Sequence, residues 1–360
     1  MSAINLLSPG RIGDIAIRNR IFMAPMTRSR ATFENVPTPI AVEYYAQRAS
    51  AGLIITEGTA PSADGIGYLC TPAIETTEQI AAWKHITEAV HASGGRICLQ
   101  LMHVGRVCNV ANRVVQDPPV APSALKVSGK IATRSGPQDF SMPRELEARE
   151  IPAIIGGFAS ATRNAVAAGF DGVQLHAASG YLPMQFLSTG SNRRTDGYGG
   201  TLRNRLRFVI ETLEAMIEAA GSPSRVSLKI SPAMQFNDIQ DDDPVETYSA
   251  LTEAIATMHL AFLLVLRSDI LPNICEILRP LFRGTFAASG GYTQESADAA
   301  LASGSADFIA FGKAFISNPD LPYRFKAGAP LTPWDASTFY AGGAHGYTDY
   351  PAVAAAAGSA

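Results

Sequence analysis

The sequence predicts an α/β protein folded as one (β/α)₈ barrel, also called a TIM barrel, over residues 1–360. About eight short apolar runs recur along the chain with helical patterns between them, as in a parallel barrel. Polar residues follow several of these runs directly, and barrels place their chemistry at the carboxyl ends of their strands. The length of 360 residues also lies within the range of a single barrel.

The elements follow in order along the chain. Residues 7–20 alternate apolar and polar around two glycines, which predicts a hairpin that closes the bottom of the barrel. Thr38-Pro39 and Asp243-Pro244 have the form of helix starts. The expected helices cover 39–50, 77–93, 153–168 and 201–219, and another begins at 243. The eight expected strands are 21–24, 53–56, 97–101, 172–175, 226–230, 262–265, 286–288 and 308–311.

Two segments depart from the repeating pattern. Residues 104–150 hold no strong period and are rich in proline and glycine, so we expect an excursion over the barrel mouth. Residues 352–360 are rich in alanine and are expected to form a flexible tail.

Composition excludes several classes of protein. The net charge of −3 does not favour a nucleic-acid or membrane-surface partner. The longest apolar run, 261–266, is far shorter than the ~20 residues of a membrane span. The four cysteines are scattered and the six histidines show no metal-ligand spacing. The N-terminus lacks a signal-peptide pattern. We therefore expect a cytoplasmic protein, a monomer or homodimer, without a metal.

One stretch of the sequence, 171–200, concentrates useful side chains. The apolar run 172–175 ends in His176, Ser179 and Tyr181, which is how a barrel strand presents catalytic groups. A buried His and Tyr satisfied by the backbone would be the structural alternative for this pattern by itself.

Glycines follow the last two expected strands. Gly290-Gly291 and Gly312-Lys313 occupy the two positions where barrels often bind phosphate, so a phosphate-bearing ligand is expected. Thr27, Gln100, His176 and Lys229 lie at other strand ends. Gln suits the amide-like edge of a heterocycle. A Lys can face developing negative charge, although an ordinary salt bridge would also explain it.

Long motifs in one order make the chain similar to the old yellow enzyme family of flavin-dependent ene-reductases. They cover nearly the whole length: NRIFMAPMTR at 19–28, EYYAQR at 43–48, the stretch 171–200, GKAFISNPDL at 312–321 and FYAGGAHGYTDYP at 339–351.

The resemblance implies a non-covalent FMN at the barrel mouth and NAD(P)H as electron donor. It places Lys229 at the flavin N1/O2 edge and the glycines with Lys313 at the phosphate. The implied cofactor-binding residues are Pro25, Met26, Thr27, Gly58, Gln100, Lys229, Gly290, Gly291, Gly312, Lys313 and Phe339.

The resemblance also implies a reaction, the reduction of the C=C bond of an enone or enal. His176 and Ser179 would hold the carbonyl oxygen, hydride would reach Cβ from flavin N5, and Tyr181 would protonate Cα. The implied substrate-binding residues are Tyr68, Met102, His176, Ser179, Phe236 and Tyr340.

Four residues depart from the family pattern. Ser179 stands in place of Asn or His, Met102 in place of Trp, Met184 in place of a polar residue, and Lys313 in place of Arg. An altered pocket leaves a flavin-dependent isomerase, a dehydrogenase or a specialised biosynthetic reductase as alternatives. Two further alternatives are a pseudo-enzyme that binds ligand without turnover and a flavin-free phosphate-binding barrel such as an aldolase.

Overall fold

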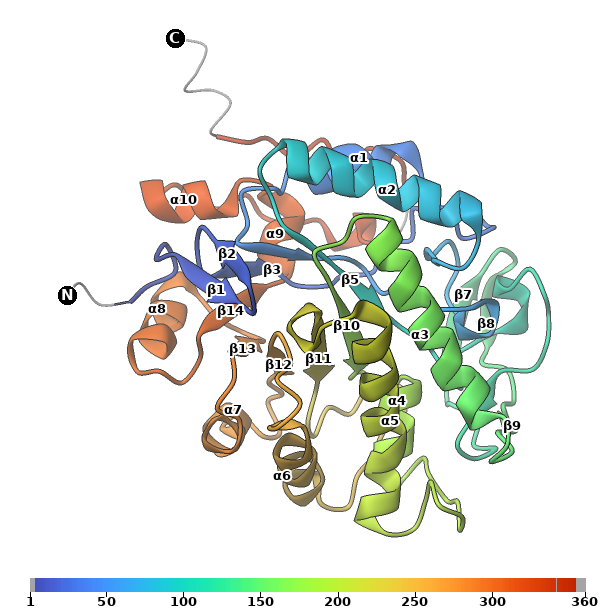
Figure 1. Ribbon diagram of the computed structural model, residues 1–360. Helices are drawn as coiled ribbons and strands as arrows, with labels where there is room; N and C mark the ends of the chain where they lie inside the picture. The colour runs from blue at the N-terminus through green and yellow to red at the C-terminus, as the bar shows by residue number, and fades with distance from the viewer. Residues whose placement is uncertain (1–3, 341, 354–360) are drawn as a thin grey trace.

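The computed structural model describes residues 4–340 and 342–353. A closed barrel of eight parallel strands forms its centre, with helices packed around it (Figure 1). The strands follow one another around the barrel in chain order, and β14 pairs with β3 to close it. The predicted fold class is confirmed. The barrel strands are β3 (Ile21–Met23), β4 (Leu53–Ile55), β5 (Ile97–Leu101), β10 (Gly172–Ala177), β11 (Val226–Ile230), β12 (Leu263–Leu266), β13 (Phe286–Ser289) and β14 (Phe308–Phe311).

Local signals start several of the surrounding helices. Asp243 caps α6 by accepting a hydrogen bond from the Glu246 amide at 2.9 Å, as expected from an acid before a proline. Thr38 does not cap α1 in this way, because its hydroxyl donates to the Arg30 carbonyl instead. The helices are α1 (Pro39–Ala46), α2 (Thr77–Ala92), α3 (Ile151–Ala167), α4 (Leu182–Leu187), α5 (Leu202–Ala220), α6 (Pro244–Ile255), α7 (Ile274–Leu278), α8 (Gln294–Ala302), α9 (Lys313–Ser317) and α10 (Leu321–Ala327).

Short 3₁₀ turns complete the connections between these elements. They are η1 (Ala63–Gly65), η2 (Val110–Asn112), η3 (Pro223–Arg225), η4 (Arg279–Leu281) and η5 (Ala336–Thr338). The expected helix 39–50 is four residues too long, since α1 ends at Ala46 and turns follow it.

The predicted hairpin closes the amino-terminal end of the barrel. Strands β1 (Gly10–Ile12) and β2 (Ile15–Ile17) pair antiparallel. Their buried isoleucines pack with barrel residues that include Phe22 and Phe308, whose rings stack with centroids 4.7 Å apart. Because this hairpin closes the amino-terminal end of the barrel, the opposite end remains available for a ligand.

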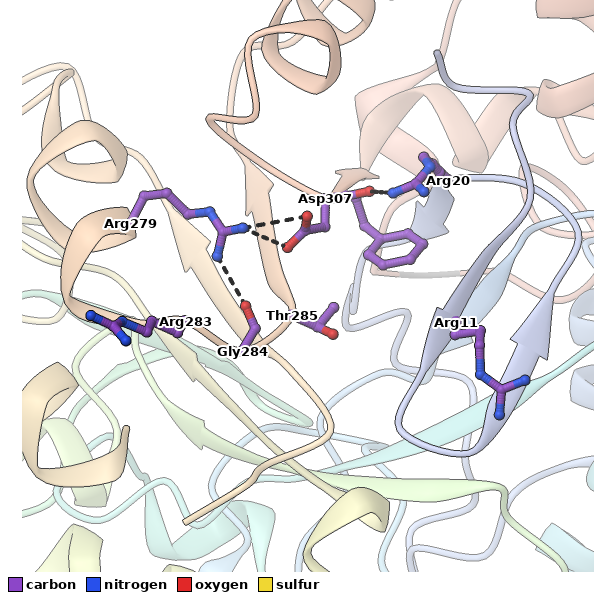
Figure 2. Close-up of a pocket in the computed structure, with 8 residues that line it drawn as sticks. Arg11, Arg20, Arg279, Arg283, Gly284, Thr285 and Asp307 are labelled. Atoms are coloured by element: carbon purple, nitrogen blue, oxygen red, sulfur yellow. Dashed lines mark hydrogen bonds and ion pairs between the residues drawn. The ribbon is translucent and has the colours of Figure 1, made fainter. Parts of the chain in front are cut away.

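An arginine-lined hollow of about 390 Å³ lies at this amino-terminal end. Figure 2 shows Arg279 directed at Asp307, with which it forms an ion pair at 3.2 Å. Arg20 donates to the Asp307 carbonyl, and Arg279 also donates to the Gly284 carbonyl. These contacts tie together the loops that precede β13 and β14, so we interpret these two arginines as structural.

Residues 104–150 form small sheets outside the barrel, on the side opposite the hairpin (Figure 1). Strands β6 (Val120–Ala121) and β9 (Arg144–Glu145) pair in parallel, and β7 (Lys130–Thr133) and β8 (Gly136–Asp139) form a hairpin. Apolar side chains of this segment pack into one cluster with Tyr181. The excursion therefore reaches the predicted site. The expected flexible tail lies almost wholly outside the described residues.

Candidate active site

The register of the barrel brings the predicted polar residues together. His176 of β10 lies directly beside Lys229 of β11. On the other side of β10, Gln174 lies beside Gln100 of β5, and Gln100 Nε2 donates to Gln174 Oε1 at 2.8 Å. Parallel strands end at the same side of the barrel, so these four side chains share one region near its mouth.

His176 is built to act as a neutral hydrogen-bond donor. Its Nδ1 accepts a hydrogen bond from the Ala178 amide at 3.2 Å, so the proton of the neutral ring is assigned to Nε2. Burial holds the pKa of His176 well below its ordinary value, and the nearby Lys229 charge lowers it further. The imidazole therefore offers an Nε2–H without carrying charge at neutral pH.

Tyr181 lies close to His176 and keeps its proton. The two rings meet edge to face with centroids 4.9 Å apart. The Tyr181 hydroxyl donates to the Tyr68 hydroxyl at 3.1 Å. Burial raises the pKa of Tyr181 well above its ordinary value. A buried phenol that stays protonated is suited to give a proton to a strongly basic carbon.

Ser179 occupies an unusual backbone conformation in the turn between β10 and α4. Its φ of 57° lies in the left-handed region, which non-glycine residues seldom adopt. Its amide donates to Ser231 Oγ at 2.9 Å, and its carbonyl accepts from Asn237 Nδ2 at 2.9 Å. The Ser179 side chain is half-buried, and Ser179 precedes Tyr181 by two residues in the chain.

An outer cavity of about 640 Å³ opens beside Tyr181. Its walls carry more apolar than polar surface, and the excursion contributes one side of them through Val127 and Ile131. Tyr68, Phe236 and Tyr340, all expected to bind substrate, line the cavity together with Tyr181.

Met102 is placed differently from the other expected substrate residues. It is buried, packs in the cluster around Tyr181 and is absent from the residues that line the outer cavity. A Cβ at Gly58 would collide with the Met102 sulfur. Met102 thus fills the space next to the glycine expected to contact the flavin.

The two expected phosphate loops lie at the ends of neighbouring strands. Gly290 and Gly291 follow β13 with φ values of 98° and 72°, a left-handed turn that only glycine adopts freely. Gly312 follows β14 and caps α9, where exposed Lys313 begins the helix. Arg267 Nη2 donates to the Gly290 carbonyl at 2.7 Å. This supporting role of Arg267, the residue that follows β12, could not be predicted from the sequence.

A further set of expected flavin contacts lies after β3. Pro25, Met26 and Thr27 are half-buried there. The next residue, Arg28, donates from its amide to the Glu57 carboxylate at 3.1 Å and from Nε to the Phe339 carbonyl at 3.1 Å. One arginine thus ties the C-terminal segment that carries Phe339 to the β3 and β4 loops.

The polar groups near the mouth fit a flavin. Gln174 Nε2 is buried and has no hydrogen-bond partner among the described residues. Lys229 is also buried, burial lowers its pKa to about 8, and no described residue pairs with its ammonium. Buried unpaired donors are costly. A bound heterocycle with acceptor atoms and a negative edge would satisfy both donors.

Comparison with known proteins decides the family. The family model described as the NADH:flavin oxidoreductase / NADH oxidase family matches residues 5–332. The chain belongs to this family. It is 41% identical to 12-oxophytodienoate reductase 1 of Oryza sativa subsp. japonica, over 97% of this chain and 93% of that protein.

Solved structures of this flavin oxidoreductase family agree with the observed barrel. Morphinone reductase superposes with a TM-score of 0.94 at 43% identity, covering 98% of this chain and 97% of the other. An old yellow enzyme homologue from Zymomonas mobilis superposes with a TM-score of 0.94 at 40% identity, covering 96% and 99%. The predictions of the old yellow enzyme family, of FMN with NAD(P)H, and of an enzyme that reduces C=C bonds of unsaturated compounds are confirmed.

The described residues hold no cluster of three or more His, Cys, Asp or Glu side chains that could bind a metal. Within the same residues, no helix has the length and apolar character that crossing a membrane requires.

Gln174, Ser231 and Asn237 lie at this candidate site and were not predicted from the sequence. Gln174 had a weak signal, a polar residue inside an apolar run, whereas Ser231 and Asn237 had none.

Proposed function

We propose that this flavin oxidoreductase reduces the C=C bond of α,β-unsaturated ketones and aldehydes bound next to His176 and Tyr181. The observation that carries the proposal is the pairing of a neutral imidazole donor with a protonated phenol, 4.9 Å apart between ring centroids, beside an apolar cavity. The imidazole of His176 can donate a hydrogen bond to a carbonyl oxygen. The phenol of Tyr181 can donate a proton to the α carbon of the same substrate.

His176 and Ser179 hold the substrate oxygen in this proposal. His176 donates from Nε2, and Ser179 donates from Oγ directly or through a water. Negative charge develops on that oxygen as the double bond is reduced, so fixed donors favour the transition state over the bound substrate. Because His176 is uncharged, its contribution is a hydrogen bond rather than a formal positive charge.

Tyr181 completes the addition. Its O–H bond breaks as a C–H bond forms at the α carbon, and the phenolate then regains a proton from solvent. The raised pKa of Tyr181 makes the phenol a weak acid, which matches a reaction in which the acceptor carbon is strongly basic.

Bound FMN supplies the hydride that NAD(P)H provides. Lys229 would lie beside the edge of the flavin ring that becomes anionic, and Gln100 with its partner Gln174 would bind the polar edge. Main-chain groups of the two glycine loops would hold the phosphate. We assign ring contacts to Pro25, Met26, Thr27, Gly58, Gln100, Lys229 and Phe339, and phosphate contacts to Gly290, Gly291, Gly312 and Lys313.

The substrate walls favour sizeable apolar compounds. Tyr68, Phe236 and Tyr340 line a cavity of about 640 Å³. Met102 lies outside this wall, in the cluster around Tyr181, and is smaller and more adaptable than the Trp of many relatives. We assign substrate contacts to these four residues together with His176 and Ser179. A cyclic enone held by several aromatic side chains fits this cavity better than a short enal.

The test begins with the colour of the purified protein, which should be yellow and should release FMN into the supernatant on heating. Turnover of a cyclic enone should then consume one NAD(P)H for each saturated product. Product formation without NAD(P)H consumption would favour the isomerase alternative. A protein that neither contains nor binds FMN would contradict the assignment.

Three broader features belong to the same proposal. We propose that residues 1–360 act as one FMN-binding domain in which 104–150 cover the barrel mouth. We also propose a cytoplasmic location and a monomer or homodimer, which cell fractionation and size-exclusion chromatography with light scattering would test.

A further inference from the structure

Two side chains from the segment after β11 hold the main chain of Ser179 on both sides. Ser231 Oγ accepts the Ser179 amide proton at 2.9 Å, and Asn237 Nδ2 donates to the Ser179 carbonyl at 2.9 Å. Ser231 is completely buried. The peptide groups of Ser179 are therefore fixed by a neighbouring strand end rather than by their own turn.

The turn needs such support because its backbone is strained. Ser179 has a φ of 57°, and Gly180 follows with a φ of 77°. A left-handed serine persists only where surrounding contacts hold it. Met184 adds a third contact, because its sulfur accepts the Gly180 amide at 3.2 Å and the Ser231 hydroxyl at 3.7 Å. Ser231 thus lies where these contacts meet.

Asn237 also lies near the proton donor. Its side chain holds the Ser179 carbonyl, and it lines the outer cavity together with Tyr68 and Tyr181. Tyr68 accepts the Tyr181 hydroxyl proton at 3.1 Å. The backbone of Asn237 is itself left-handed, with a φ of 58°, a conformation in which Asn is enriched.

We propose that Ser231 and Asn237 are positioning residues that hold Ser179 in its left-handed conformation and thereby set the place of the carbonyl-binding donors relative to Tyr181. The proposal rests on the roles proposed above for His176, Ser179 and Tyr181. Ser231 lies two residues after Lys229 on the same chain segment. The strand that carries the flavin-facing cation therefore also fixes the turn that meets the substrate.

The experiment compares Ser231→Ala and Asn237→Ala in two backgrounds, the natural Ser179 and Ser179→Asn. Asn tolerates the left-handed region better than Ser, so the turn should depend less on its supports once Asn is present. We expect kcat/KM for 2-cyclohexenone to fall about tenfold in either alanine variant with Ser179, since small misplacements are costly in catalysis. In the Ser179→Asn background the same changes should cost about threefold or less.

Ser227→Ala is the matched control. Ser227 is equally buried on the same strand, but its hydroxyl donates to the Val173 carbonyl inside the barrel. Its loss should lower the melting temperature while kcat/KM changes less than about twofold. FMN content and melting temperature are measured for every variant. Half-buried Asn237 provides the second variant if Ser231→Ala fails to fold.

Equal losses in the two backgrounds would overturn the proposal, because Ser231 and Asn237 would then act independently of the Ser179 conformation. Unchanged activity in both alanine variants would overturn it as well. Tyr181→Phe and His176→Ala separate this result from a failure of the proposed function. If they impair alkene reduction while the Ser231 and Asn237 variants do not, the function stands and the positioning role is wrong.

Discussion

Replacing Ser179 with Asn should raise both the stability of the protein and its activity on small enones. A left-handed backbone costs an ordinary residue roughly 1–2 kcal/mol, and Asn bears less of this cost than Ser. Relief of about 0.5 kcal/mol would raise the melting temperature by about 0.7 °C in a chain of 360 residues, because the unfolding entropy is about 2.1 cal/mol/K per residue. The observed φ of 57° at Ser179 is the basis of this estimate.

The activity gain has a separate origin. Asn offers two N–H donors on a longer arm than the single Ser hydroxyl. One lost donor to a developing oxyanion costs about 2.7–4 kcal/mol in other enzymes. In the natural protein His176 and a bridging water supply part of the stabilisation of the oxyanion. We therefore expect Ser179→Asn to add about 1.4 kcal/mol of transition-state stabilisation, a tenfold rise in kcat/KM.

The assay follows NAD(P)H oxidation with several small cyclic enones, alongside thermal unfolding of each protein. Ser93→Asn is the control, because Ser93 is exposed at the end of α2 with an ordinary φ of −83°. It should change neither quantity. If Ser179→Asn proves no faster than the natural protein on all of the enones, the idea of a missing donor at Ser179 is wrong.

The site supports three further predictions. Tyr181→Phe should leave flavin reduction by NAD(P)H nearly intact but slow flavin reoxidation by an enone about 10²–10⁴-fold; stopped-flow measurement of the two half-reactions checks this, and equal damage to both would argue against a proton donor. Met102→Trp should narrow the range of bulky cyclic enones accepted, and an unchanged substrate profile would show that position 102 does not face the ligand. Lys229 has a pKa of about 8 in the fold against an ordinary 10.5, so between these values the unfolded chain binds more protons and the stability of flavin-free protein should rise with pH. Lys229→Met should lack that rise in urea unfolding at pH 8, 9 and 10, and an identical rise in both proteins would assign it to another group.

The sequence was sufficient to predict the barrel because its evidence is local. Buried parallel strands are short apolar runs, and most of them end near a polar residue or glycine. The start of α6 at Pro244 was likewise predictable, because the Asp243 cap is written in adjacent residues. The six-residue helix α4 was missed because it is too short to show a helical period.

The site was predictable only in part, for a physical reason. Which side chains lie at strand ends follows from the pattern, but which of them touch depends on how the barrel closes. The hydrogen bond from Tyr181 to Tyr68 joins residues 113 positions apart. The left-handed φ of Ser179 has no signal either, since serine is not a residue that marks this conformation.

The pairing of His176 with Lys229 explains why the number of hydrogen-bond donors matters at this site. Burial is the larger cause of the low pKa of His176, and the Lys229 charge is the smaller one. A flavin with an anionic edge beside Lys229 would offset part of the effect of the Lys229 charge on the pKa of His176. The effect of burial on that pKa would remain, so with the cofactor bound burial would still hold the pKa of His176 low. In the proposed reaction the charge that develops on the substrate oxygen would then be stabilised by hydrogen bonds, so the conformation of Ser179 and the side chains that hold it should affect the rate.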